Sequence, residues 1–187
     1  MKKKLPIILS LLLVLGFSTF AAWRLVSFNN QDPKNNGNED QNKMPAGSVL
    51  SANLGTEIYN DLNFGFTFNK PEGFSIDAYQ QGEGQAIWIV SADGKGVIQA
   101  LVTPFELAGI EINKEYINAQ FPGVLVQNER VVLIGGFRGL FFESNNQAFG
   151  GDNIEAWFIS GNNLYQISGF KQNGSQIEQL MSSWRFN

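Results

Sequence analysis

The N-terminal segment constrains this chain more than any other part of it. Three lysines at positions 2–4 precede an apolar run from Leu5 to Trp23. The length of this run is close to the roughly 20 apolar residues that span a bilayer. It exceeds the roughly 7–15 apolar residues of a cleavable signal peptide. We therefore expect residues 1–28 to form an uncleaved signal anchor, one N-terminal transmembrane helix. A signal peptide cleaved near Ala22 and a buried helix of a soluble protein are the alternatives.

The charges beside this run predict its orientation. Three lysines precede it and Arg24 follows it, so the positive-inside rule places the N-terminus in the cytoplasm. We expect a single-pass protein of the cell membrane whose C-terminal part is extracytoplasmic. The chain has no Cys, which excludes both lipid attachment at a cysteine and a disulfide framework. The fold must therefore be held by its core.

Residues 29–56 have the composition of a linker. They are rich in Asn, contain Pro33 and Pro45, and carry few large apolar side chains. Such a segment buries too little apolar surface to offset the entropy of ordering its backbone. We expect a disordered polar linker with an end-to-end reach of roughly 30 Å.

Residues 57–187 have the length of one domain and are acidic. Seven Lys and Arg stand against fourteen Asp and Glu in this segment, which gives a net charge near −7, whereas the whole chain has −4. Nucleic acids require a basic surface, so they are not expected as partners. The same charge argues against binding to an anionic membrane surface. The expected partners are the membrane, through the N-terminal helix, and an envelope or membrane protein.

The domain is expected to consist mainly of strands. Phe64 to Phe68 alternates apolar and small or polar residues, which places three Phe on one face of a strand. Asp93-Gly94 and Gly161-Asn162-Asn163 are hairpin signals, and consecutive hairpins give an antiparallel sheet. Gly135-Gly136 separates two further strands. The further strand candidates are a short strand from Phe74, Ala86–Ser91, Val97–Val102, Val124–Ile134, Phe137–Ser144, Ile154–Ser160 and Leu164–Phe170.

Two helices are expected beside this sheet. Asn113 can cap a short helix that ends at Pro122-Gly123. Ser175 and Glu178 form the pattern of a capping box. Four apolar residues then follow at helical spacing and must bury against the sheet: Ile177, Leu180, Met181 and Trp184. The predicted fold class is α+β, an antiparallel β-sheet flanked by helices.

The order of several short motifs resembles that of PsbP-like domains. These motifs are the Phe64–Phe74 stretch, Val131–Gly136 ending in Gly-Gly, Glu155-x-Trp157 with Leu164-Tyr165, and Trp184-Arg185-Phe186. The resemblance covers nearly all of residues 57–187. It implies an α-β-α sandwich and a role like that of the extrinsic photosystem subunits or of related binding and assembly factors. The chain has no His, so the metal-binding histidines of photosynthetic members have no counterpart here.

The residues available for catalysis are few. Without Cys and His, thiol nucleophiles, Ser-His-Asp triads and His-containing zinc sites are excluded. Glu143 and Glu155 lie on strands that can be neighbours, and a pair of carboxylates is what glycoside hydrolysis requires. The alternative is that each is a solvated strand residue or an ion-pair partner, for instance of Arg138.

Other candidate sites have weaker patterns. Asp152, Asn153 and Glu155 can offer oxygen ligands to a cation such as calcium, but they lack the spacing of a calcium loop. Four aromatic residues can line a ligand cleft or belong to the core: Trp88, Trp157, Tyr165 and Trp184. Asn173-Gly174-Ser175 is a formal N-glycosylation sequon, whose Ser is also the expected helix cap.

Taken together, these patterns favour a membrane-tethered extracytoplasmic binding or assembly module that is not an enzyme. No catalytic, cofactor-binding or metal-binding residue is assigned. Two alternatives remain open: a small carboxylate-dependent hydrolase acting on envelope glycans, and a pocket protein for a small apolar ligand. A hydrolase requires convergent carboxylates in a cleft, and a pocket protein requires a large apolar cavity.

Overall fold

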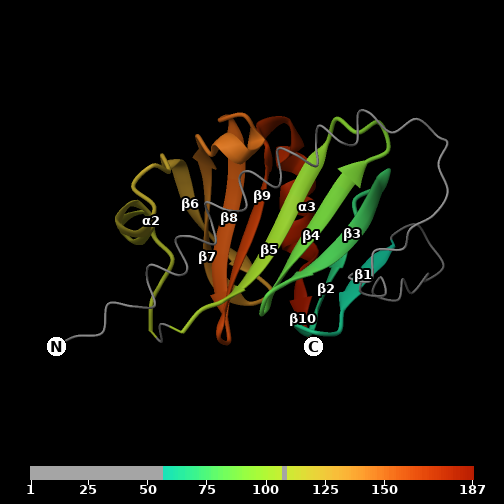
Figure 1. The fold of residues 1–187 in the computed structure, drawn as a ribbon, viewed down its shortest axis with the longest axis horizontal. Coiled ribbons are helices and arrows are strands. Elements are labelled where there is room, and N and C mark those ends of the chain that lie inside the picture. Colours follow the sequence, from blue (N-terminus) through green and yellow to red (C-terminus); the bar gives the residue numbers. More distant parts are fainter. Residues whose placement is uncertain (1–56, 107–108) are drawn as a thin grey trace.

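The computed structural model describes residues 57–106 and 109–187, and these form two antiparallel sheets with helices beside them (Figure 1). The expected anchor at 1–28 and linker at 29–56 lie outside the described residues. In the part that is described, no helix has the length and apolar character to cross a membrane. The strands are β1 Ile58–Asp61, β2 Phe66–Asn69, β3 Phe74–Gln81, β4 Gly84–Ser91, β5 Val97–Pro104, β6 Gln127–Ile134, β7 Phe137–Ser144, β8 Asn153–Ser160, β9 Asn163–Phe170 and β10 Arg185–Phe186. The helices are α2 Lys114–Gln120, α3 Gly174–Ser183, and the 3-10 turns η1 Gln147–Phe149 and η2 Lys171–Asn173.

The large sheet confirms the predicted hairpins. Its strand order is β3-β4-β5-β9-β8-β7-β6, and every neighbouring pair is antiparallel. Gly135 and Gly136 have φ values of +58° and +90°, the left-handed region that a two-residue type I′ turn requires and that glycine tolerates. β6 begins at Gln127, later than the predicted Val124, and Val126 just before it is buried in the core cluster that contains Ile117 of α2. The α+β fold class is therefore confirmed.

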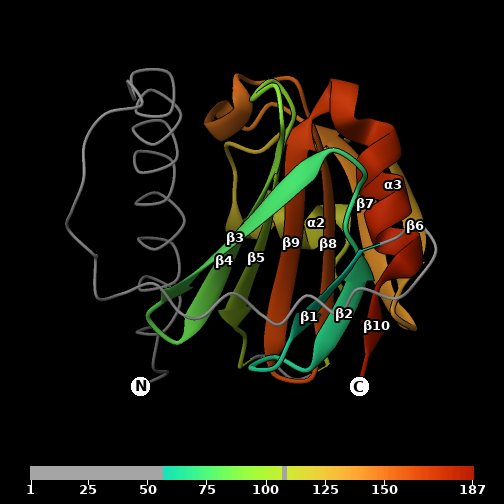
Figure 2. The same ribbon diagram turned by 90° about the vertical axis from the view of Figure 1, so that its right-hand side faces the viewer.

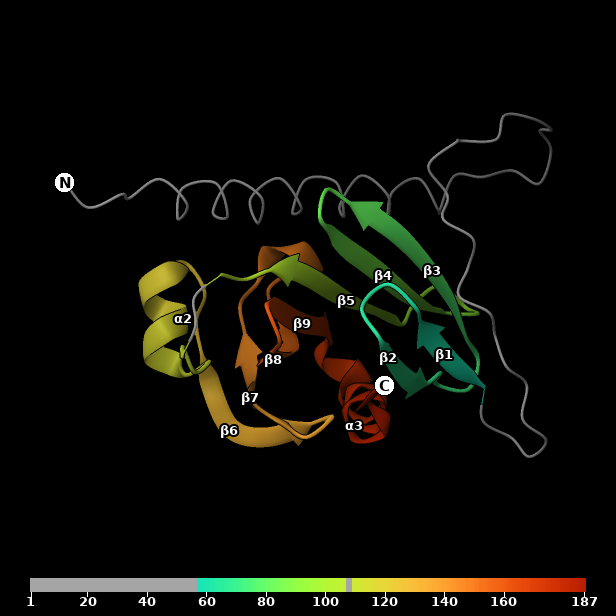
Figure 3. The ribbon, with the colours of Figure 1, turned by 90° about the horizontal axis from the view of Figure 1, so that it is seen from below.

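The large sheet curves around α3 and the small sheet, so that its two faces differ (Figure 3). We call the side that holds α3 the concave face and the opposite side the convex face. Ile177 and Leu180 of α3 are fully buried against the concave face. Trp184, directly after the helix, is also fully buried and stacks on Phe66 with ring centroids 4.4 Å apart. The predicted apolar stripe of this helix is confirmed.

Helix α2 covers part of the convex face. Its N-cap is Asn113, as predicted, whose Oδ1 accepts a 2.8 Å hydrogen bond from the backbone N–H of Tyr116. Ile117 is fully buried in a second core cluster together with Leu140 and Trp157 of the sheet. The large sheet thus lies between α3 on one face and α2 on the other. Figure 2 shows this arrangement from the side of α3.

The capping box predicted for α3 is wrong. The helix begins at Gly174, before Ser175, and follows directly on η2. The hydroxyl of Ser175 donates to the side chain of Gln176, and Glu178 is paired with Arg130. Because β9 leads into α3 through η2 without an intervening loop, tertiary packing determines the start of the helix, and no side-chain cap forms at Asn173.

The small sheet has the order β1-β2-β10 and was not predicted from the sequence. β2 lies between the two ends of the described domain: Tyr59 of β1 pairs with Phe68, and Arg185 of β10 pairs with Thr67. Phe66 and Phe68 of β2 are buried at 0% and 1% exposure. The sheet therefore places the alternating Phe residues of β2 directly over α3 and the concave face.

Candidate functional site

The two carboxylates considered for hydrolysis do not converge. Glu155 is the register partner of Phe142, so both point to the convex face. Glu143 follows Phe142 in β7 and therefore points to the concave face. Its carboxylate accepts a 2.8 Å hydrogen bond from Lys171 Nζ, which lowers the pKa of Glu143. The ion-pair partner of Glu143 is thus Lys171 and not Arg138. Glu143 and Glu155 do not form a two-carboxylate catalytic site.

Glu155 is an internal group of the sheet. Its side chain is 1% exposed, and burial raises the pKa of its carboxyl. Its oxygens accept hydrogen bonds from the Ser144 hydroxyl, from Trp157 Nε1 at 2.7 Å and from the Ser168 hydroxyl at 3.4 Å. A substrate cannot reach a carboxyl that is enclosed in this way. The arrangement holds β7, β8 and β9 together on the convex face.

The candidate cation ligands Asp152, Asn153 and Glu155 are not assembled into a site. Asn153 is fully buried, and its Nδ2 donates a 2.5 Å hydrogen bond to the carbonyl of Asn146. Asp152 is exposed, while both oxygens of Glu155 already accept hydrogen bonds. Among the described residues, no group of three or more His, Cys, Asp and Glu side chains is placed to hold a metal ion.

Three of the four aromatic residues proposed to line one cleft belong to the two cores. Tyr165 and Trp184 lie in the concave core with centroids 6.1 Å apart, whereas Trp157 is buried in the convex core. Trp88 is half-buried on β4. The sequon asparagine Asn173 is 5% exposed and donates its side-chain N–H to the carbonyl of Val97 at 3.1 Å, so the folded domain does not offer it for glycosylation.

The structure exposes an apolar surface on the convex face, which sequence reasoning missed. We call it the β6–β8 patch and define it by Ile110, Val131, Leu133, Arg138 and Ile159. Leu133 is 74% exposed, Val131 56% and Ile110 37%. Alternation along β6 does predict a strand with these residues on one face. This alternation does not indicate, however, that α2 leaves the convex face of β6 uncovered.

Arg138 lies at the centre of the patch. It is the register partner of Leu133 on β6, and Ile159 of β8 is the next position beyond the Gly139–Phe158 pair. The cation is therefore flanked by aliphatic side chains on both neighbouring strands. In the described part of the chain, its guanidinium has neither an ion pair nor a hydrogen bond.

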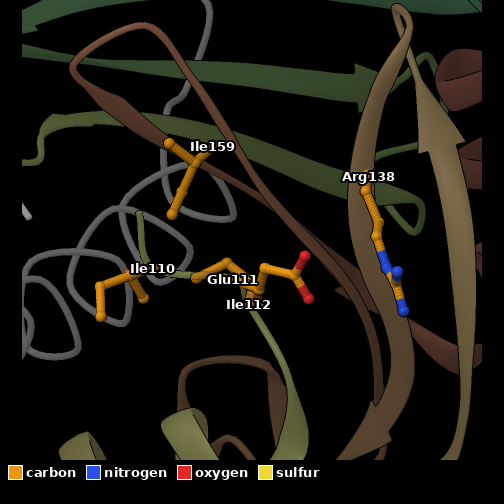
Figure 4. A pocket seen from close by; sticks show the side chains of 5 residues that line it. All are labelled: Ile110, Glu111, Ile112, Arg138 and Ile159. Carbon is orange, nitrogen blue, oxygen red and sulfur yellow. The ribbon is translucent and has the colours of Figure 1, made fainter. Parts of the chain in front are cut away.

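A shallow pocket opens beside Arg138. Its volume is about 220 Å³, and it is lined by Ile110, Glu111, Ile112, Arg138 and Ile159. Figure 4 shows the Glu111 carboxylate turned toward the strand that carries Arg138. Ligand sites for small molecules usually measure about 300–1,000 Å³ and enclose most of the ligand. The pocket is smaller than that, so the patch is better suited to contact with another protein surface.

Comparisons with the models of known protein families and with curated proteins found no match to this chain.

Proposed function

We propose that this protein is a non-enzymatic binding or assembly module, tethered by its N-terminal helix to the extracytoplasmic side of the cell membrane. The β6–β8 patch is the surface through which it contacts a protein partner. The apolar run from Leu5 to Trp23 supports the tether. The order of motifs, together with an antiparallel sheet that carries a helix on each face, supports a PsbP-like α-β-α domain.

One observation carries the binding role: large aliphatic side chains are exposed next to each other around Arg138, which has no ion-pair partner among the described residues. Val131 and Leu133 lie two positions apart on the same face of β6, and Arg138 lies beside Leu133. Clustered exposed apolar side chains are typical of interaction sites, whereas isolated ones require no explanation. Arginine is enriched in protein interfaces, where its apolar stem and its charge both contribute.

The chain offers a matched control for a test of this proposal. Leu62, in the turn after β1, is 74% exposed, the same fraction as Leu133, but lies outside the patch. A photo-crosslinking amino acid is introduced at position 133 or 62 of the full-length chain in native membranes. We expect discrete protein adducts from position 133 and not from position 62. Equal labelling from both positions, or none from position 133, would refute the patch as a docking surface.

A pocket protein for an apolar ligand remains the second candidate, on the basis of the small cavity beside Arg138. The three isoleucines of its lining fit such a ligand, but Glu111 and Arg138 also line it, and its volume of about 220 Å³ is below the usual range for ligand sites. Exchange of Ile159 for Trp would fill this cavity and leave the outer edge of β6 unchanged. Adducts from position 133 to a different protein that are retained in the Ile159→Trp variant would favour the protein partner.

A further inference from the structure

Strand β6 is an edge strand of the large sheet. No strand within the described residues pairs with its outer edge. The type I′ turn at Gly135-Gly136 closes on the pair Ile134–Phe137, and a two-residue turn of this kind closes on a hydrogen-bonded pair. The backbone groups of Ile134 therefore point toward β7. By alternation, those of Val131 and Leu133 point outward, where a further strand can pair with them.

Only the first half of this edge is protected. A bulge interrupts the register between Gln127 and Arg130, and Asn128 adopts a φ of +50° there. Glu129 is paired with Lys114, and Arg130 with Glu178. Bulges and charges are the usual means by which sheet edges avoid pairing with other strands.

The second half has no such protection. From Arg130 to Ile134 the pairing with β7 is regular, and the next two side chains on the convex side of the strand are Val131 and Leu133, which are exposed. An open edge with exposed aliphatic residues at alternate positions is a template for strand addition.

We propose that the occupant of this edge is the β6 strand of a second copy of this chain, paired antiparallel about a two-fold axis at Val132. This register places Val131 opposite Leu133 of the second copy and Leu133 opposite its Val131. Because the axis is perpendicular to the sheet, corresponding faces stay on the same side. Four exposed aliphatic side chains then form one cluster on the convex face, and the two large sheets become continuous.

Self-complementarity is the reason for choosing a second copy over an unrelated segment. An axis at Val132 sets the exposed Val131 opposite the exposed Leu133 of the second copy, so the aliphatic side chains of the two edges meet each other on the convex face. Each domain has a net charge near −7, which opposes association. The charges next to the edge are nevertheless already neutralised by the Glu129–Lys114 and Arg130–Glu178 pairs.

The contact is small, and the membrane tether compensates for its size. Five paired residues and four side chains fall short of the about 1,200 Å² that a stable interface in solution buries. Confinement to a membrane raises the effective concentration of one copy for another. In this respect the inference rests on the proposed membrane anchoring. The dimer is therefore a property of the anchored chain, and it leaves Arg138 of each copy free for a partner.

The absence of Cys makes a disulfide test possible. In the proposed register Val132 lies opposite Val132 of the second copy in a non-hydrogen-bonded pair. The Cα atoms of such a pair are about 4.5 Å apart, which is within disulfide range. Full-length Val132→Cys and Leu62→Cys are oxidised mildly in native membranes. Leu62 is the more exposed position, so random collisions would favour it. We expect about tenfold more disulfide-linked dimer from Val132→Cys.

A second variant tests whether the open edge is required. Val131→Pro in the Val132→Cys background removes an outward N–H without taking a hydrogen bond from the β6–β7 ladder. We expect it to abolish the dimer, and Val131→Lys to do the same if the proline variant fails to fold. Equal crosslinking at positions 132 and 62, or a dimer that survives both substitutions, overturns the inference. Adducts from position 133 to a different protein without a Val132→Cys dimer would overturn the dimer while leaving the proposed function intact.

Discussion

The hydroxyl of Tyr59 donates a 2.9 Å hydrogen bond to Asp61 Oδ2, two residues further along β1, and both side chains are buried. Gln85 of β4 donates to the same carboxylate oxygen at 2.8 Å. Asp61 Oδ1 accepts from the backbone N–H groups of Asn63 and Phe64 at 3.0 and 2.9 Å. One buried carboxylate thus closes the β1–β2 turn and joins the small sheet to the large one.

Exchange of Asp61 for Ala is expected to cost about 3 kcal/mol or more of unfolding free energy, because four donors lose their acceptor and a buried unpaired donor costs about 1–3 kcal/mol. Asp61→Asn keeps one acceptor oxygen and the shape, and should cost about 1–2 kcal/mol. Tyr59→Phe removes one donor and is the matched control. Urea unfolding of the full-length chain measures all three. A loss for Asp61→Ala no larger than that for Tyr59→Phe would contradict this account.

Leu180 and Ser175 of α3 should respond very differently to truncation. Leu180 is fully buried against the concave face, so Leu180→Ala should cost about 2–5 kcal/mol through lost contacts and a residual cavity. Ser175 is exposed and caps no backbone N–H of the helix, so Ser175→Ala should stay within about 0.5 kcal/mol of wild type. Denaturant midpoints distinguish the two. A cost above about 1 kcal/mol for Ser175→Ala would restore the capping role that the sequence suggests.

The buried carboxyl of Glu155 predicts a pH dependence of stability. Its pKa is raised above the ordinary 4.5 by burial, so the folded state binds this proton more tightly than the unfolded state. The resulting stabilisation is complete below the ordinary pKa and is lost as pH rises through the raised one. Relative to Glu155→Gln, the wild type should therefore lose unfolding free energy as pH rises above the ordinary pKa of 4.5.

Glu143 provides a control of opposite sign for this titration. The hydrogen bond from Lys171 lowers the pKa of Glu143, so its contribution is present above the ordinary pKa and is lost as pH falls. Relative to Glu143→Gln, the wild type should lose stability only on the acid side, and by a small amount because the pair is exposed. Unfolding at several pH values tests both variants. Identical pH profiles for the wild type and Glu155→Gln would remove Glu155 as the source.

The membrane topology gives a further prediction. If lysines 2–4 lie in the cytoplasm, as the positive-inside rule predicts, protease added outside spheroplasts should digest a C-terminal tag while the proposed anchor stays in the membrane fraction. Deletion of residues 1–28 with their targeting information should leave the tag inside intact cells and protected. A tag of the full-length chain that is digested only after lysis would reverse the orientation. A soluble mature protein that begins near Ala22 would establish cleavage.

Most strands and both α-helices of the domain follow from local sequence, and the reasons are physical. Asn113 caps its helix, and the glycine-containing turns form hairpins, because these features depend on neighbouring residues. The small sheet was missed because β10 has two residues and pairs with a strand more than a hundred positions earlier. No local periodicity can signal such a strand.

The candidate sites were harder to predict, since they depend on which face a side chain occupies and on what covers it. A single step along β7 separates the face of Phe142 from that of Glu143, and this removes the expected pair with Glu155. In the β6–β8 patch, the β6 residues Val131 and Leu133 follow the alternation of an ordinary strand with a buried apolar face. It is a surface because α2 packs over Leu140 and Trp157 and leaves Val131 and Leu133 uncovered.

The pairing of β10 with β2 also affects how the protein is made. β2 is synthesised among the first strands of the domain, and its partner β10 follows every other strand in sequence. Trp184, which stacks on Phe66, emerges just before β10. During N-to-C synthesis, the Phe residues of β2 therefore stay uncovered until the final helix and strand have been made. Folding of the core can finish only after the last residues have been synthesised, so the nascent chain requires protection from aggregation during that interval.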